Sequence, residues 1–238
     1  MKNFIFKIDD NSEISLLHDE GVFQPTATTN YLINGVIKKL HNKNISSLLD
    51  LGCGSGVVGI SLFKKLTINK IFASDYSKRS TEVAKENFLR NKTSYDVRHG
   101  SLYEPWDSYK FDVIVDDISG ISSVIASISS WFEGVPCESG DDGTDLTIKV
   151  LENSKKHLNP NGVLFFPVIG LSDTSKIEMT ANKIFGSFEV VSENEWPIPK
   201  DLLQHDKLLN DLQDKKKINL IEKFGIKLCI TKIIMVTA

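Results

Sequence analysis

The sequence predicts an α/β fold with a doubly wound, mostly parallel β-sheet. Short apolar runs recur along the chain between turn-forming residues. In these runs polar residues do not alternate with apolar ones, as they would in a half-exposed strand. The absence of alternation is typical of buried parallel strands. Amphipathic helical patterns separate these runs, and strands that alternate with helices form sheets with right-handed crossovers. The length of 238 residues suits one large domain.

Residues 1–45 are predicted to form an N-terminal extension of this sheet, made of a short hairpin and a helix. Two apolar runs flank a group of turn formers, and Thr28 or Thr29 then suits the N-cap of the helix. The expected elements are strands at Phe4–Ile8 and Ile14–Leu17 and a helix from about Asn30 to His41. Residues 46–238 are expected to form the main domain, and the two parts to pack as one compact unit.

The main domain is predicted to begin with four buried strands that alternate with four helices. The strands are expected at Leu48–Leu51, Ile71–Ser74, Val113–Val115 and Val163–Pro167. The helices are expected at Val57–Leu66, Ser77–Asn91, Asp145–Leu158 and Thr174–Phe185. Asn159–Gly162 is rich in turn formers and predicts a turn before the fourth strand.

The C-terminal part continues this pattern less regularly. Phe188–Ser192 predicts a strand, and the charged segment Leu202–Phe224 is expected to be mostly helical, with Gly225 as its C-cap. Ile226–Val236 is apolar and rich in β-branched residues, so it is expected to be the last strand.

Composition excludes several classes of protein. Lys plus Arg is 28 and Asp plus Glu is 31, and the net charge of −3 gives no general attraction to nucleic acid or to an anionic membrane. The three cysteines are odd in number and no two have the spacing of a metal-binding pair, so neither a disulfide framework nor a metal site is predicted. No apolar run reaches the ~18 residues of a membrane span, and a cytoplasmic location is expected.

A glycine-rich turn follows the first buried strand. Glycines there let a ligand approach the backbone closely, and the first crossover of a doubly wound sheet is where ligands bind. Asp75 ends the next strand, where an acid can hold ribose hydroxyls. Together, the turn and Asp75 predict a site for a cofactor that contains a nucleoside.

The identity of that nucleoside depends on Asp50. Gly54, Gly56 and Gly59 have the spacing of a dinucleotide-binding turn, which keeps a nicotinamide-dependent oxidoreductase as an alternative. Yet the turn already starts at Gly52, and Asp50 lies two residues before it. A carboxylate there repels a pyrophosphate but suits the ammonium and sulfonium of S-adenosylmethionine. The other interpretation of Asp50 is a carboxylate that caps a helix or a loop.

Leu49–Gly56 resembles the first motif of the class I S-adenosylmethionine-dependent methyltransferases without a mismatch. Val22–Pro25 followed by Thr29 is similar to the segment ahead of that motif in the small-domain group, which includes release-factor glutamine methyltransferases and several RNA methyltransferases. Gly143–Leu146 and Leu158–Leu164 resemble their late helix and fifth strand. This resemblance implies a sheet of seven strands with the last antiparallel, and an N-terminal part that covers the cofactor site.

The resemblance also implies which residues bind S-adenosylmethionine. It places the methionyl part against Gly52–Gly56 and the ribose on Asp75. Where the family often has Gly-Asp-Leu against adenine, this chain has Gly100-Ser101-Leu102, so the acid is replaced. The residues expected to bind the cofactor are Asp50, Gly52, Cys53, Gly54, Gly56, Asp75, Tyr76, Ser101, Leu102 and Asp116.

The active-site motif departs from the family. Glutamine and adenine methyltransferases carry Asn or Asp and then Pro-Pro-Tyr after the fourth strand, whereas this chain has Asp117-Ile118-Ser119-Gly120. Asp117 falls on the Asn or Asp position and is the candidate to orient or deprotonate the acceptor. The residues expected to contact the acceptor are Phe23, Thr29, Ile118, Ser119 and Trp131, and the loop 131–143 is a candidate substrate wall or lid.

Because the Pro-Pro-Tyr part is missing, the resemblance leaves the acceptor open. The leading hypothesis is methyl transfer to an oxygen or nitrogen of a small molecule. A protein acceptor, of the glutamine type or another, and an RNA acceptor are alternatives, although the low positive charge argues mildly against RNA. A catalytically silent cofactor-binding module is a further alternative.

Overall fold

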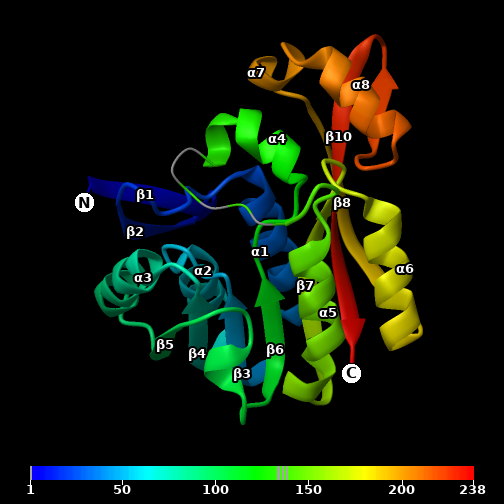
Figure 1. Ribbon diagram of the computed structural model, residues 1–238. Helices are drawn as coiled ribbons and strands as arrows, with labels where there is room; N and C mark the ends of the chain where they lie inside the picture. The colour runs from blue at the N-terminus through cyan, green and yellow to red at the C-terminus, as the bar shows by residue number, and fades with distance from the viewer. Residues whose placement is uncertain (1, 133–134, 136, 138) are drawn as a thin grey trace.

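The computed structural model describes residues 2–132, 135, 137 and 139–238 (Figure 1). Its main sheet has the strand order β5-β4-β3-β6-β7-β10-β8, and the short β9 also pairs with β10. The strands are β3 (Asn44–Leu51), β4 (Thr67–Asp75), β5 (Tyr95–His99), β6 (Phe111–Asp116), β7 (Leu158–Ile169), β8 (Glu189–Pro197), β9 (Leu220–Lys223) and β10 (Ile226–Thr237). Strands β3 to β7 are parallel, whereas β10 runs antiparallel to its neighbours. The predicted fold class is confirmed, but the described sheet has eight strands and not the seven expected, because β9 pairs with β10.

Helices cover both faces of this sheet (Figure 1). They are α1 (Ala27–Leu40), α2 (Val57–Lys65), α3 (Lys78–Arg90), α4 (Ser123–Ile128), α5 (Asp145–His157), α6 (Thr174–Phe185), α7 (Lys200–Leu203) and α8 (Asp206–Asp214). Strand β3 is buried on both faces, because Leu48 belongs to the core under α1–α3 and Leu49 to the core under α5 and α6. No helix among the described residues has the length and apolarity to cross a membrane.

The N-terminal extension has the predicted elements. Strands β1 (Lys2–Asp9) and β2 (Ser12–His18) form an antiparallel hairpin that packs on α3. Helix α1 begins at Ala27 after the N-cap Thr26, so the expected cap at Thr28 or Thr29 was wrong. The Thr29 side chain instead accepts a hydrogen bond from Thr26 N at 3.4 Å, which is half of a capping box. The division of the chain at residue 45 stays a prediction.

Two further predictions about local structure were wrong. Asn159–Gly162 is not a turn but part of β7, where the pairing with β6 shifts its register. The segment Leu202–Phe224 is helical only over α7 and α8, and it then forms the hairpin β9–β10. Phe224 and Gly225 make the turn of that hairpin, with φ of +54° and +74°, so Gly225 is a turn residue and not a helix cap.

Candidate active site

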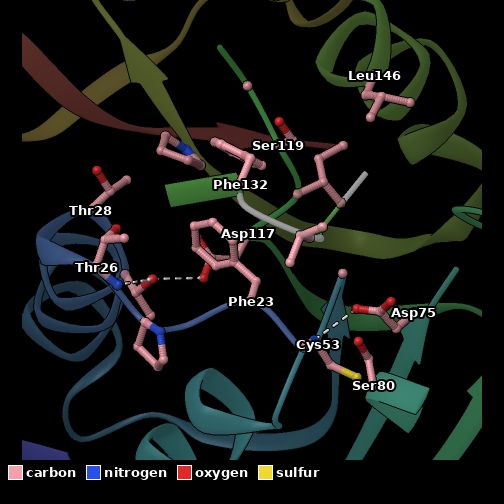
Figure 2. A pocket seen from close by; sticks show the side chains of 18 of the residues that line it. Phe23, Thr26, Thr28, Cys53, Asp75, Ser80, Asp117, Ser119, Phe132 and Leu146 are labelled. Atoms are coloured by element: carbon pink, nitrogen blue, oxygen red, sulfur yellow. Dashed lines mark hydrogen bonds between the residues drawn. The ribbon is translucent and has the colours of Figure 1, made fainter. Parts of the chain in front are cut away.

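A cavity of about 430 Å³ lies at the carboxyl ends of β3, β4, β6 and β7. This is the edge of a doubly wound sheet at which ligands bind, and the volume lies in the range of small-molecule sites. Figure 2 shows Phe23, Thr26 and Thr28 from the N-terminal part on one side, and Asp75 and Ser80 on the other. The predicted cofactor turn and the predicted acceptor residues therefore share one cavity.

The glycine turn is fixed by the neighbouring strand. The amides of Gly52 and Cys53 donate to Ser74 O at 2.9 and 3.0 Å. Gly54 N donates to Asp75 Oδ2 at 2.8 Å, a bond drawn in Figure 2. Gly54 has φ of +51° and open space where a Cβ would stand, so the turn presents bare backbone to the cavity.

Asp75 joins this turn to the start of α3. Its Oδ1 accepts from Ser77 N at 2.7 Å while Oδ2 accepts from Gly54 N. Burial raises the pKa of this carboxyl, and the two backbone amides oppose the rise. Each carboxylate oxygen has a second lone pair, so ribose hydroxyls can still bind to it.

Asp50 lies beneath the turn and not on the cavity wall. Its Oδ2 accepts from Gly59 N at 2.8 Å, in the first turn of α2, and its Oδ1 is buried without a hydrogen-bond partner. A carboxyl at this place caps the helix, which was the alternative interpretation of Asp50. Burial raises its pKa to about 8, the Gly59 amide lowers it, and the charges of Asp117 and Asp75 raise it further.

Asp116 and Asp117 diverge from the end of β6. The buried Asp116 turns back, and its Oδ1 accepts from Ile118 N at 3.1 Å. Asp117 lines the cavity, and its Oδ2 accepts from Thr29 Oγ1 at 3.1 Å. Burial raises the pKa of both carboxyls to about 7; the Thr29 bond lowers that of Asp117, and the charge of Asp116 raises it. At neutral pH, Asp117 is therefore present in both protonation states.

Aromatic rings from distant segments form the rest of the wall beside Asp117. Phe23 and Phe132 lie 5.1 Å apart between ring centroids, and Figure 2 shows both next to Asp117. Trp131 and Trp196 pack edge to face at 5.9 Å, and both line the cavity. This end of the cavity can hold a flat or apolar group against a carboxyl.

Comparisons with known proteins agree with this geometry. The family model described as MTS, methyltransferase small domain, matches residues 13–117. A bifunctional methyltransferase of Rickettsia bellii is 28% identical over 207 residues, covering 84% of this chain and 35% of that protein. The solved structure of the T. thermophilus 16S rRNA N2 G1207 methyltransferase with AdoMet and guanosine has a TM-score of 0.65 at 14% identity, covering 99% of this chain and 50% of that one. Residues 13–117 thus resemble the methyltransferase small domain, and the chain shares its fold with the solved methyltransferase.

The chain is also similar to a release factor glutamine methyltransferase of Clostridium acetobutylicum, at 25% identity over 181 residues. The match covers 72% of the chain and 63% of that protein. The chain spans about a third of the length of the Rickettsia relatives that it matches, 35% and 31% in two species. The solved T. thermophilus structure holds AdoMet, which is the cofactor that the sequence predicts for this chain.

The described residues fit that cofactor. The chain offers bare backbone at Gly54 and a carboxyl at Asp75, and Asp75 and Asp117 are the only acidic or basic side chains among the described residues of the cavity wall. A wall without Lys or Arg suits a cationic sulfonium and an ammonium better than a pyrophosphate. Which of these residues hold the cofactor stays a prediction.

Most of the predicted site residues line this cavity. Those that do are Phe23, Thr29, Gly52, Cys53, Gly54, Asp75, Tyr76, Ser101, Leu102, Asp117, Ile118, Ser119 and Trp131. Asp50, Gly56 and Asp116, which were expected to bind the cofactor, do not line it. Leu102 has φ of +46°, which is uncommon outside glycine and is typical of a residue held in place at a ligand site.

Sequence reasoning missed several wall residues. The missed residues include Thr26, Thr28, Ser77, Ser80, Leu146, Pro167, Ile169, Leu171 and Trp196. Trp196 follows the predicted strand Phe188–Ser192 by four residues, and it reaches the cavity because β8 extends to Pro197. In the loop 131–143, Trp131, Phe132 and Val135 line the cavity as the substrate-wall hypothesis expects, whereas residues 133, 134, 136 and 138 lie outside the described part of the chain.

Replacement of Asp75 by alanine is expected to weaken the binding of S-adenosylhomocysteine by about 1–3 kcal/mol, roughly five- to 150-fold. The change removes the predicted ribose acceptor and a hydrogen bond that fixes Gly54. Calorimetric titration measures the effect. Asp96→Ala is the control, because Asp96 pairs with Arg98 outside the cavity. Unchanged affinity in Asp75→Ala would remove Asp75 from the cofactor site.

Proposed function

We propose that this protein transfers a methyl group from S-adenosylmethionine to a nitrogen of a protein side chain or terminus. The observation that carries the proposal is the acceptor end of the cavity, where Asp117 lies among Phe23, Phe132 and Trp131 and no Lys, Arg or His is present among the described wall residues. Such a wall favours a neutral or cationic nitrogen over a phosphate-rich strand. The name of the Clostridium relative gives a protein acceptor, which supports the same choice.

The main contribution of the protein to the reaction is to align the acceptor with the methyl group. When bound, S-adenosylmethionine supplies a methyl group on a positively charged sulfur. The sulfur departs as a neutral thioether, which is a good leaving group. The aromatic rings beside Asp117 exclude water and hold the acceptor, and a fixed geometry of this kind removes much of the barrier. The small-molecule acceptor of the leading hypothesis gains no support from the named relatives.

Asp117 is the residue that we propose to act on the acceptor nitrogen. Thr29 Oγ1 holds its Oδ2, which leaves Oδ1 to accept a hydrogen bond from the acceptor N–H. An amine that arrives as an ammonium must lose a proton before it reacts, and the Asp117 carboxylate can take that proton. An amide needs orientation before methylation, and the same oxygen provides it.

A labelling experiment tests the acceptor class. The purified protein is incubated with methyl-labelled S-adenosylmethionine and, separately, with a release factor, ribosomal protein fractions, ribosomal RNA and a panel of small amines and amides. We expect label in a protein, resistant to ribonuclease and released by protease. Label in RNA or in a small molecule would overturn the protein acceptor, and no transfer to any member of the panel would favour the silent cofactor-binding module.

A further inference from the structure

A buried amide on α3 joins two segments that are far apart in the sequence. Asn87 is fully buried, and its Nδ2 donates to Ser55 O at 2.9 Å and to Leu17 O at 3.0 Å. Its Oδ1 accepts from Leu17 N at 2.6 Å. Both N–H groups and the carbonyl of the side chain are therefore used, and they connect the N-terminal hairpin to the glycine turn.

The Ser55 end of this link lies in the cavity wall. Ser55 stands between Gly54 and Gly56 in the turn that presents bare backbone to the cavity. The residue after Asn87 supports the same turn, because a Cβ on Gly56 would lie 3.0 Å from the Phe88 ring. Helix α3 thus backs the turn with a packed ring and a hydrogen bond on the side away from the cavity.

The Leu17 end lies in the hairpin. Both main-chain groups of Leu17 bond to the Asn87 side chain, as they would to a neighbouring strand. An edge strand with unpaired groups would otherwise need water or another chain. The hairpin is therefore attached to the same side chain that holds the turn, so a displacement of β2 strains the bond to Ser55.

We propose that Asn87 is a positioning residue for the cofactor, which fixes the Gly52–Gly56 turn through Ser55 O and couples that turn to the N-terminal hairpin through Leu17. The identity of the bound molecule rests on the proposed function, whereas the ordering of the turn does not. In this arrangement the hairpin, which supplies no wall residue between Lys2 and His18, contributes to cofactor affinity from a distance.

Asn91 provides a matched control on the same helix. Its Nδ2 donates to Ser15 O in the hairpin and to Asn87 O, both at 2.9 Å, but makes no bond to the turn. Asn87→Ala and Asn91→Ala therefore both loosen the hairpin, and only the first releases Ser55 O. The two variants are compared by thermal unfolding, by hydrogen exchange of the amides of residues 52–60 without cofactor, and by titration with S-adenosylhomocysteine.

For Asn87→Ala we expect exchange of the 52–60 amides to be faster by about tenfold and the Kd for S-adenosylhomocysteine to rise by about tenfold, because buried carbonyl groups lose their partner. Both quantities are expected to stay within about twofold of wild type in Asn91→Ala. If Asn87→Ala does not fold, Asn87→Ser, which keeps a hydroxyl, is measured in the same way.

Equal changes of the exchange rates and of the Kd in the two variants would overturn the proposal, because loosening of the hairpin would then explain both. Wild-type exchange in a folded Asn87→Ala or Asn87→Ser protein would overturn it as well. If the wild-type protein binds neither S-adenosylmethionine nor S-adenosylhomocysteine, the proposed function fails. The exchange rates of the cofactor-free variants still decide whether Asn87 orders the turn.

Discussion

Replacement of Asp117 by alanine is expected to lower the rate of methyl transfer by about 10²–10⁴-fold. Asp117 is the only acidic or basic side chain among the described residues at the aromatic end of the cavity, and Thr29 holds one of its oxygens. The affinity for S-adenosylhomocysteine is expected to stay within about threefold, because the cofactor turn is held by Ser74 and Asp75. Transfer of label to the protein acceptor and calorimetry measure the two quantities.

Thr29→Val is the matched variant for this prediction. It keeps the shape of the side chain and removes the bond to Asp117 Oδ2 together with the long bond from Thr26 N, so a loss of about two- to tenfold is expected. In the wild type, the rate is expected to rise with pH up to about 7 and then level, because burial raises the pKa of Asp117 to about 7 and the carboxylate is the active form. A pH-independent rate in the wild type, or full activity in Asp117→Ala, would contradict the role of this residue.

The free energy of unfolding is expected to fall as pH rises from about 4 to about 8. Burial raises the pKa of Asp50 to about 8 and those of Asp116 and Asp117 to about 7, from 3.8 in the unfolded chain. In this window the folded state therefore holds protons that the unfolded state has released. Each such group lowers the free energy of unfolding by up to about 1.4 kcal/mol per pH unit, and the loss is complete above the folded pKa.

Asp50→Asn isolates the largest of these contributions. The amide oxygen can still accept from Gly59 N, and the amide has no charge to bury. The free energy of unfolding of the variant is measured with urea at several pH values between 5 and 8. It is expected to fall less steeply with pH than that of the wild type, by the equivalent of one proton, and to be higher than that of the wild type at pH 8. An unchanged slope would mean that Asp50 is already ionised in the folded protein.

The fold and the two ends of the candidate site were predictable because their signals are local. The run Leu48–Leu51 directs leucines toward both cores, with Asp50 as its one polar residue, and the glycine turn follows it directly. Asp75 ends β4 and Asp117 follows β6, the two strands that flank β3, so the carboxyl edge of the parallel sheet brings them together. Each of these conclusions needs only a short window of sequence and one rule about sheets.

The position of the Asp50 side chain was predicted less well, although the two-residue period of a strand indicates the face to which it points. Residues two apart in a strand share a face, so Asp50 points to the same side as Leu48, where α1–α3 pack. The first turn of α2 lies there and binds the carboxyl through Gly59 N. The motif indicates the kind of ligand, whereas the direction of the Asp50 side chain depends on the strand and helix that surround it.

The errors in the C-terminal part have another cause. The segment Leu220–Lys223 is too short to show a period of its own, and it becomes a strand only because it pairs with β10. Trp196 reaches the cavity from β8, and Phe132 from a short turn after α4, so their meeting with Asp117 depends on packing between separate elements of the fold. Such placement follows from tertiary packing and not from a local pattern.

The order of the strands has a consequence for how the chain matures as it is synthesised. In the described structure β8 pairs only with β10, which follows it in the sequence and lies between it and β7. While residues 226–237 are still inside the ribosome, β8 has no partner, although β3 to β7 and their helices can already assemble. The nucleoside end of the cavity is thus built first, and the wall that holds Trp196 is completed last, so a nascent chain can recognise its cofactor before it can enclose an acceptor.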